Sequence, residues 1–312
     1  MVDTVNIGHS YDGPKWTVSQ MVKKPAFVPN LVKRLVADSN LADWMLRTGP
    51  TAVGGAVVYE ETVALYSDSE GEVVAEFGEI PGTSAGMATP VTRSTTKRGV
   101  HLKISQEMVD RNDVGRVRDE IEMVRRTLVN GRDRALINTV LSNPNVLTGA
   151  AGNAGTGGWL SGTSSIITDI ADAVYEISSQ EPVDGVQYEE KLGYDADIMI
   201  IHPSLEAGLI DNDKVNSIFA GSPLADQQLR YTGKLPKKFL NLNVMKSWRC
   251  PADKVIIAQR NYMGFISKEK PLSGSPMRPD PDTESYRTNF SYRELVAVDN
   301  PKAVFILTGV NA

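Results

Sequence analysis

The sequence of 312 residues predicts an α+β fold, in which helices and strands follow one another in a mixed order and not as a regular βαβ repeat. Three observations lead to this prediction. A long helical pattern follows an alternating strand within residues 97–143. Residues 197–202 form a continuous apolar run, which is typical of a strand buried on both faces. From residue 243 onward, short strand patterns follow one another without a helical pattern between them.

Residues 1–26 show no periodicity and contain several glycines and prolines, which predicts an arm that is extended or ordered only by its neighbours. Between residues 29 and 47 an apolar pattern predicts a helix or a helix pair, broken near Asp38-Ser39. The residues of this pattern are Leu31, Leu35, Leu41, Trp44 and Met45.

Residues 48–92 contain no lysine or arginine but seven acids, which are Glu60, Glu61, Asp68, Glu70, Glu72, Glu76 and Glu79. Strand patterns at 57–66 and 72–77 flank a turn, and a return rich in glycine, proline and threonine follows at 81–90. A lone hairpin is marginal in water, and this one has little apolar surface. We therefore expect it to project and to lean on something else.

The stretch 97–143 begins with an alternating strand whose apolar positions are Val100, Leu102 and Ile104. Ser105 can cap a short helix over 106–111. A second, longer helix is predicted from Asn112 or Asp113 by an apolar stripe at steps of three, four or seven. Its members are Val114, Val117, Ile121, Val124, Leu128 and Ala135.

This second helix is expected to end at Asn143, because Pro144 pushes the preceding residue out of the helical region. About thirty residues at roughly 1.5 Å each make a rod of about 45 Å, which is long for a globular helix. Gly115 and Gly131 each cost about 1 kcal/mol relative to alanine inside a helix. We expect packing to hold the rod straight, with either glycine permitting close packing or a bend.

The rest of the chain alternates loops, helices and strands. A glycine-rich run at 148–163 predicts a flexible loop. A helix follows with an apolar face from Ile166 to Ile177, a cap near Ser164 or Ser165, and an end at Glu181-Pro182. Pro203 opens another helix that runs to 210. The further predicted elements are strands at 243–248, 254–258 and 263–266, a charged, proline-rich loop at 267–283, and a two-stranded ending formed by 286–298 and 303–308.

Composition excludes several classes of protein. A formal net charge of −5 argues against a dedicated nucleic-acid binder. A single cysteine, Cys250, excludes an intrachain disulfide and a multi-cysteine metal site. The sequence has no signal pattern and no apolar run of about 18 residues, so we expect a soluble protein made in the cytosol, with no membrane partner.

No catalytic, cofactor or metal site emerges from the motifs. The glycine-rich run lacks the Gly-Lys-Ser/Thr that would cradle a phosphate. His9, His101 and His202 are far apart and form no i,i+4 pair. Cys250 has no neighbour in sequence that would lower its pKa. The carboxylates lie on surfaces predicted to be solvated or interfacial, where the pKa values of a catalytic pair would not be forced apart.

The long helix and the turn before it carry seven arginines, at positions 111, 116, 118, 125, 126, 132 and 134. Seven acids match them, and these are Glu107, Asp110, Asp113, Asp119, Glu120, Glu122 and Asp133. Mixed charge favours contacts with protein over contacts with phosphate.

This order of parts resembles the major capsid protein of tailed bacteriophages, which has the Hong Kong 97 fold. Two stretches carry the resemblance. One is the strand and short helix of residues 100–110 leading into the long helix, with Arg132-Asp133-Arg134-Ala135-Leu136-Ile137 near its end. The other is Tyr286-Arg287 through residues 293–298, followed by residues 300–305.

The resemblance implies an N-arm and its helix at 1–47, an extended loop at 48–96, a peripheral domain at 97–190 plus 284–312 that carries the long spine helix, and an axial domain at 191–283. It implies self-assembly into hexamers and pentamers of an icosahedral shell enclosing double-stranded DNA, bound without sequence specificity. Portal and scaffolding proteins, and a decoration protein, are the implied partners. The implied location is the virion capsid, after assembly in the host bacterial cytoplasm.

Two departures from the family pattern refine this expectation. Some members crosslink neighbouring subunits through a lysine on the extended loop, but this sequence has no lysine between Lys33 and Lys97, so a noncovalent shell is expected. No long charged N-terminal extension serves as a fused scaffold, which predicts a separate scaffolding protein or an arm already trimmed. The alternatives are an encapsulin shell, which encloses an enzyme, and, in a different class, a soluble metabolic enzyme with a site that the sequence hides.

The acids of the extended loop suggest how subunits meet. We expect Glu60, Glu61, Asp68, Glu70, Glu72 and Glu76 to lie opposite bases on a neighbour's long helix, namely Arg116, Arg118, Arg125 or Arg126. Each exposed pair contributes only about 0–1 kcal/mol, so the charges would fix register more than strength. The alternative is a hairpin whose acids serve solubility alone.

Overall fold

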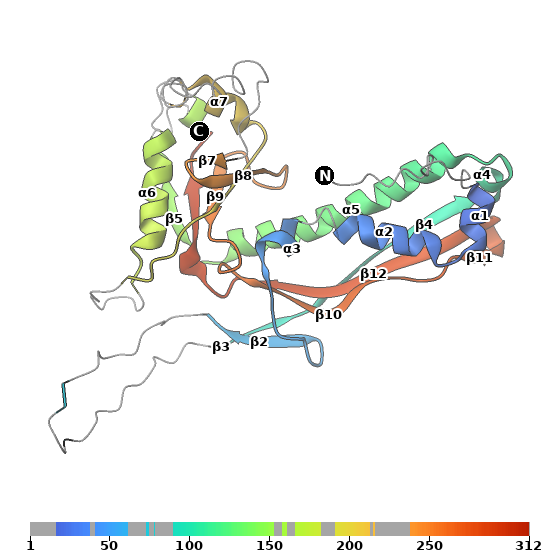
Figure 1. Cartoon of the computed structure of the whole chain (residues 1–312), viewed down its shortest axis with the longest axis horizontal. Coiled ribbons are helices and arrows are strands. Elements are labelled where there is room, and N and C mark those ends of the chain that lie inside the picture. Colours follow the sequence, from blue (N-terminus) through green and yellow to red (C-terminus); the bar gives the residue numbers. More distant parts are fainter. Residues whose placement is uncertain are drawn as a thin grey trace. The chain divides into compact units, whose positions relative to one another are not determined.

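The structure is a computed structural model that describes residues 17–37, 41–61, 73–74, 78, 90–152, 158–160, 166–181, 191–212, 215 and 238–311. The chain divides into two compact units (Figure 1). Unit 1 comprises Met1–Val57, Thr92–Leu136 and Ile266–Ala297, and unit 2 comprises Val58–Val91, Ile137–Phe265 and Val298–Ala312. The four-part division expected from the resemblance is finer and stays a prediction.

Three short helices open the described part of unit 1. They are α1 (Val18–Lys23), α2 (Phe27–Ala37) and α3 (Leu41–Met45). The predicted helix pair is thus confirmed as α2 and α3. The arm at 1–26 was expected to be extended or ordered only by its neighbours, and its described end forms α1, which contacts α2. A capping box explains α1, because the Thr17 hydroxyl accepts from the Gln20 amide and the Gln20 side chain accepts from the Thr17 amide.

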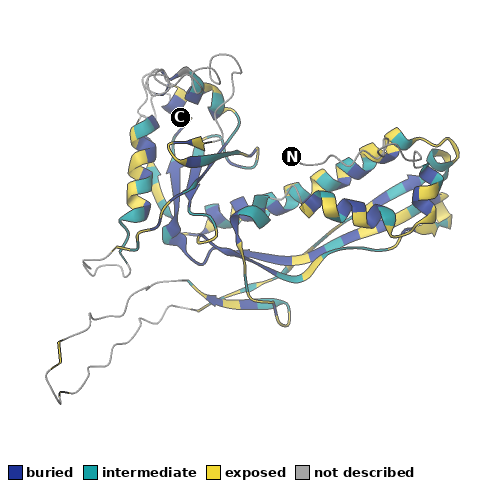
Figure 2. Ribbon diagram, viewed as in Figure 1, coloured by how far each residue is buried: buried dark blue, intermediate teal, exposed yellow. Residues whose placement is uncertain are grey.

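The strand and the two helices predicted within 97–143 are confirmed as β4 (Thr96–Ser105), α4 (Gln106–Asp110) and α5 (Val114–Ser142). The Ser105 hydroxyl caps α4 by accepting from the Met108 amide at 3.3 Å. Asn112 links the helices in a left-handed conformation, with φ of 52°, and its side-chain oxygen accepts from the Val18 amide. The apolar side of α5 is buried against α2 and the sheet (Figure 2) through Val117, Ile121, Val124 and Leu128.

A five-stranded sheet supports α5 in unit 1. Its order is β1-β10-β12-β11, and β4 also pairs with β12. The strands other than β4 are β1 (Arg47–Thr48), β10 (Phe265–Gly274), β11 (Arg278–Asp280) and β12 (Ser285–Ala297). β4 and β12 run antiparallel over ten residue pairs, from Thr96↔Glu294 to Ser105↔Ser285.

The predicted loop at 267–283 is wrong, because most of it forms β10 and β11. The charges that suggested a loop belong to residues that pair with neighbouring elements. Glu269 on β10 accepts from Arg293 on β12 at 2.7 Å, and Lys268 lies 2.7 Å from Asp43. Cross-strand ion pairs of this kind let a polar, proline-containing strand occupy a sheet.

A two-stranded sheet carries the start of the acid-rich segment. β2 (Ala56–Glu60) overlaps the start of the first predicted strand, 57–66, and its partner is β3 (Pro90–Ser94). Most of the second predicted strand, 72–77, lies outside the described residues. β3 begins at the last residue of the predicted return, 81–90. The observed strand pairing therefore joins the two ends of the acid-rich segment.

Unit 2 is built on a six-stranded sheet of order β5-β13-β9-β6-β8-β7. The strands are β5 (Leu147–Ala150), β6 (Ile198–Ile201), β7 (Lys238–Phe239), β8 (Leu242–Lys246), β9 (Lys254–Ala258) and β13 (Val304–Thr308). All four residues of β6 are buried, as the apolar run predicted. The predicted helices are α6 (Ile166–Ser178), which packs against β13 and β9, and α7 (Leu205–Asp211).

The last two long strands do not form the expected two-stranded ending. β12 belongs to the five-stranded sheet and β13 to the six-stranded sheet. The 3-10 turn η3 (Pro301–Ala303) lies between them, and η2 (Pro281–Thr283) precedes β12. Each strand is buried by pairing on both of its sides, which leaves neither with an edge for the other.

The glycine-rich run is more ordered than predicted where the structure describes it. It begins within β5 and contains the 3-10 turn η1 (Gly158–Leu160), whose Trp159 is fully buried. Gly158 has φ of +51°, and a Cβ there would lie 2.3 Å from the Val310 carbonyl oxygen. The glycine therefore permits a close backbone approach that anchors the loop. None of the helices in the described part of the chain is both long enough and apolar enough to span a membrane.

Candidate interaction surfaces

The solvent side of α5 carries the four arginines expected to make contacts. Arg116, Arg118 and Arg126 are exposed, and Arg125 is half-buried. They occupy this side because the apolar stripe of the same helix faces the sheet and α2. The structure therefore presents all four to solvent, with different immediate neighbours.

Two of the four already share an acid of their own helix. The Arg125 side chain donates to both Glu122 oxygens, at 2.6 and 2.7 Å, and Arg126 Nε donates to the same carboxylate at 2.9 Å. The Arg125 hydrogen bond is the largest influence holding the pKa of Glu122 down at about 2, against a smaller opposing effect of burial. Glu122 in turn raises the pKa of Arg125.

Arg116 and Arg118 differ in this respect. Within the described ranges, no carboxylate forms an ion pair with either guanidinium. Neither guanidinium is therefore neutralised by a carboxylate of the described residues.

The predicted acids are only partly described. Glu60 is exposed at the end of β2. Glu61 accepts from the side-chain amides of Asn143, at 3.4 Å, and Asn145, at 2.6 Å, just beyond the end of α5. Asp68, Glu70, Glu72, Glu76 and Glu79 lie outside the described residues. Glu61 thus has partners within its own chain, and the sequence did not suggest them.

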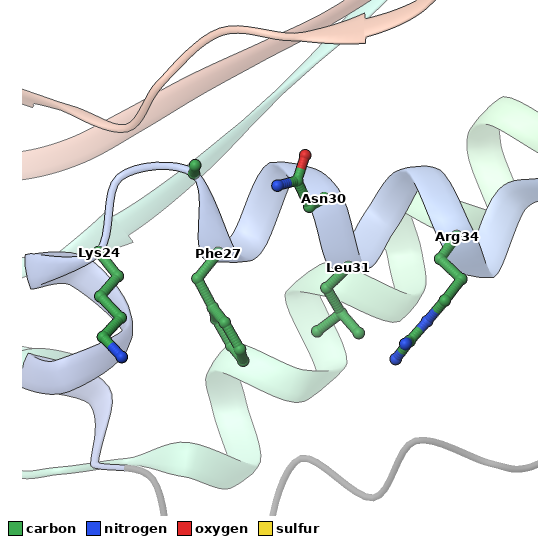
Figure 3. Close-up of a pocket in the computed structure, with 6 residues that line it drawn as sticks. Lys24, Phe27, Asn30, Leu31 and Arg34 are labelled. Carbon is green, nitrogen blue, oxygen red and sulfur yellow. The ribbon is translucent and has the colours of Figure 1, made fainter.

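A groove beside α2 is a second candidate surface, which the sequence reading missed. It encloses about 500 Å³ and is lined by Lys24, Ala26, Phe27, Asn30, Leu31 and Arg34. Figure 3 shows Phe27 and Leu31 on the same side of the helix, between the side chains of Lys24 and Arg34. Residues 17–37 contain four bases and no acid, and this imbalance was the available sequence signal.

One arginine assigned to the mixed-charge stripe of α5 is in fact buried. Arg132 Nη2 lies 2.9 Å from Glu294 of β12, and its guanidinium lies over the Tyr292 ring, 4.8 Å from the centroid. Asp43 of α3 is 3.4 Å away and also pairs with Lys268. Burial raises the pKa of Glu294, an effect that the Arg132 charge opposes but does not cancel. This cluster joins the helix to the sheet and leaves Arg132 no role on the surface.

The titratable residues offer little for catalysis. Among the described residues, no group of three or more histidine, cysteine or acidic side chains could hold a metal ion. Cys250 is buried, and burial with nearby Asp253 raises its thiol pKa to about 12. A thiol with so high a pKa is a poor nucleophile at neutral pH. The Nδ1 atom of His202 is held 2.7 Å from the Ser204 hydroxyl.

The chain was compared with known families, curated proteins and solved structures. The family model described as phage capsid protein matches residues 88–307. No curated protein matches the chain.

Solved structures similar to the chain include a virus-like particle from Pyrococcus furiosus, at 12% identity and TM-score 0.56, covering 90% of this chain and 97% of the other. A phage-related protein from Bordetella bronchiseptica RB50 has 10% identity and TM-score 0.58, with 91% and 97% covered. The capsid of a native gene transfer agent (GTA) particle has 13% identity and TM-score 0.55, with 84% and 88% covered. At these identities the likeness concerns the fold alone.

Proposed function

The chain belongs to the phage capsid protein family and has the Hong Kong 97 capsid fold, and from this premise we propose that its copies assemble into hexamers and pentamers of an icosahedral shell that encloses double-stranded DNA. The observation that carries the proposal is the family match over residues 88–307, which spans α5 and most of the five-stranded and six-stranded sheets. As a major capsid protein the chain is a structural protein.

We further propose that the shell is held by noncovalent contacts. The extended loop has no lysine to supply the amine of a crosslink. The net charge of −5 is consistent with a shell that encloses DNA without recognising its base sequence. Portal and scaffolding proteins, and a decoration protein, complete the proposed partners, and assembly takes place in the bacterial cytoplasm.

Expression of the full chain, alone and with the portal and scaffolding genes of its phage, tests the proposal. Gel filtration should give capsomers or megadalton particles, and negative-stain microscopy should show shells. Particles from infected cells should contain DNA that nuclease cannot reach. A small oligomer in both conditions would contradict a capsid role and favour the metabolic enzyme. Shells that hold a cargo enzyme and no DNA would favour the encapsulin.

The acids of the extended loop give a second, finer proposal. They lie opposite bases of a neighbouring copy's α5, and Arg116 and Arg118 are the better partners because Arg125 and Arg126 already share Glu122. Changing Glu70 and Glu72 to lysine should impair assembly, and changing Arg116 and Arg118 to glutamate should partly restore it.

The groove beside α2 supplies the matched control for this test. Lys24 and Arg34 are exposed bases in the same unit, so changing them to glutamate alters the charge equally. If the groove changes restore assembly and the α5 changes do not, the loop contacts α2 of the neighbouring copy and not α5. Normal particles from the loop variant alone would contradict both versions.

A further inference from the structure

One exposed surface of unit 2 combines an aromatic anchor with basic residues. Trp248 follows β8 and is 77% exposed. The His202 ring, at the end of the neighbouring parallel strand β6, meets it edge-on at 5.1 Å between centroids. Residues 234–249 contain no acid and five bases, which are Lys234, Lys237, Lys238, Lys246 and Arg249. Lys246 forms an ion pair with Glu206 of α7, so Arg249 is the base beside Trp248 that the proposal uses. Within the described residues, no carboxylate forms an ion pair with Arg249.

The outer face of α6 has the opposite character. Asp172, Tyr175 and Glu176 are exposed there, and Tyr175 is 69% exposed. The helix contains no lysine or arginine. Asp172 and Glu176 stand one turn apart, so their charges repel each other in the isolated chain. A cationic partner would relieve this repulsion, and an aromatic partner would cover Tyr175.

These two surfaces lie on different sides of unit 2. α6 packs on the sheet over β13 and β9, whereas β8 and β7 form the far edge of the same sheet. Figure 1 shows α6 along one side of this unit and β7 and β8 on the other. Since the surfaces differ in charge and do not face each other, one copy cannot satisfy both by itself.

We propose that Trp248 and Arg249 of one copy dock on Asp172, Tyr175 and Glu176 of the next copy, as the head-to-tail contact that closes the capsomer ring. A contact between two different surfaces of the same chain produces a ring when the rotation closes. The proposal rests on the proposed capsid function and deepens it by naming the residues through which copies meet.

The chemistry favours a second copy as the occupant. Tryptophan, tyrosine and arginine are the residues that most often dominate the energy of protein interfaces. The contact with His202 restricts the Trp248 ring before docking, so less side-chain freedom is lost when a partner covers it. The charges of the two surfaces are complementary, which selects this pairing over the contact of either surface with itself.

Charge reversal in both surfaces tests the contact. Asp172→Lys with Glu176→Lys, and separately Arg249→Glu, should each lower the yield of capsomers at least about tenfold, because like charges then oppose each other. Combining the three changes should restore part of the yield. Trp248→Ala should lower it to a similar degree, while circular dichroism stays unchanged because the side chain is exposed. Asp195→Lys and Tyr262→Ala change an exposed acid and an exposed aromatic residue of the same unit, and they should have no effect.

Disulfide trapping gives a second readout. Cys250 is buried and should not react, so introduced cysteines report alone. Glu176→Cys with Arg249→Cys should give, on oxidation, a ladder of covalent oligomers up to the size of the ring, whereas each single variant stays monomeric. A dimer from a single variant would show a symmetric contact and overturn the proposal.

The remaining outcomes separate the two levels of the argument. If the unmodified chain forms no capsomers or shells, the capsid function fails and the contact fails with it. If shells form and every reversal variant also assembles normally without a ladder, only the proposed contact fails. Normal shells that lose a separate capsid-binding protein on Trp248→Ala would likewise overturn it, in favour of a docking site for that protein.

Discussion

Arg132 of α5 and Glu294 of β12 form a 2.9 Å ion pair although both side chains are more than nine-tenths buried. Tyr292 lies under the same guanidinium, and Asp43 stands beside it. Taking two charges out of water is costly, so such a pair is tolerated only when each charge keeps its partner. The pair therefore ties the long helix to one position on the sheet of unit 1.

Removing one member of this pair should be far more harmful than removing a surface arginine. Arg132→Ala leaves the Glu294 carboxylate buried without its guanidinium, and we expect the free energy of unfolding to fall by about 3–5 kcal/mol. Arg134→Ala is the matched control, because Arg134 is exposed two residues further along the helix. Denaturant unfolding of the two variants and of the unmodified chain measures both effects. Equal effects would show that the buried pair has no special role.

The two glycines of α5 should respond differently to alanine. A Cβ at Gly115 would meet nothing closer than 3.6 Å, so Gly115→Ala should stabilise the chain by about 0.4–1 kcal/mol. A Cβ at Gly131 would lie 3.3 Å from the Tyr292 hydroxyl, and the Gly131 carbonyl accepts from Arg98 at 2.8 Å. Gly131→Ala should therefore gain less or destabilise. Thermal unfolding distinguishes the two, and a larger gain at Gly131 would show that close packing is not its role.

Glu122 should contribute to stability in a way that depends on pH. Its pKa falls from 4.5 to about 2 in the folded chain, so its contribution is present above pH 4.5 and is lost as the pH falls towards 2. Because the group is half-exposed, Glu122→Gln should cost at most about 1 kcal/mol at pH 7, and less in high salt. Unfolding curves from pH 7 to pH 3 should converge for variant and unmodified chain. Glu120→Gln serves as control, and a difference that grows on acidification would contradict the assignment.

Asp169 should matter more to unit 2 than its place in an acidic helix suggests. Its carboxylate accepts from the buried Trp159 indole at 2.9 Å and from the Gly152 amide at 3.1 Å. Asp169→Ala leaves both donors without this acceptor, and we expect a loss of about 1–3 kcal/mol together with a shift of tryptophan fluorescence. Thr168→Ala, at the neighbouring exposed position, should change neither. An unchanged fluorescence spectrum in the Asp169 variant would contradict the anchoring role.

Periodicity was sufficient to predict the elements whose own residues alternate or repeat between buried and exposed positions. The alternation before Ser105 and the apolar stripe from Val114 onward correspond to β4 and α5, and the apolar run at 197–202 corresponds to β6. In each case the spacing of the apolar residues shows whether one face or both faces of the element are buried. The family was suggested separately, by the resemblance of the order of parts and of two sequence stretches, and the match over residues 88–307 confirms it.

Features that depend on distant partners were not visible in this way. β10 resembled a loop because its charges are neutralised by Arg293 and Asp43, which are 24 residues away and on another element. Arg132 resembled a surface arginine because no residue near it in sequence indicates that it is buried in an ion pair with Glu294.

The sequence by itself therefore determined the α+β class, the long helix and the capsid family, because these follow from local periodicity and from the order of parts. Only the tertiary structure decided that β12 and β13 enter different sheets, that Arg125 and Arg126 share Glu122, and that Trp248 stands exposed beside His202. Those relationships are set by the packing of segments far apart in the chain, where the energy of a charge or an aromatic ring depends on the neighbour it meets.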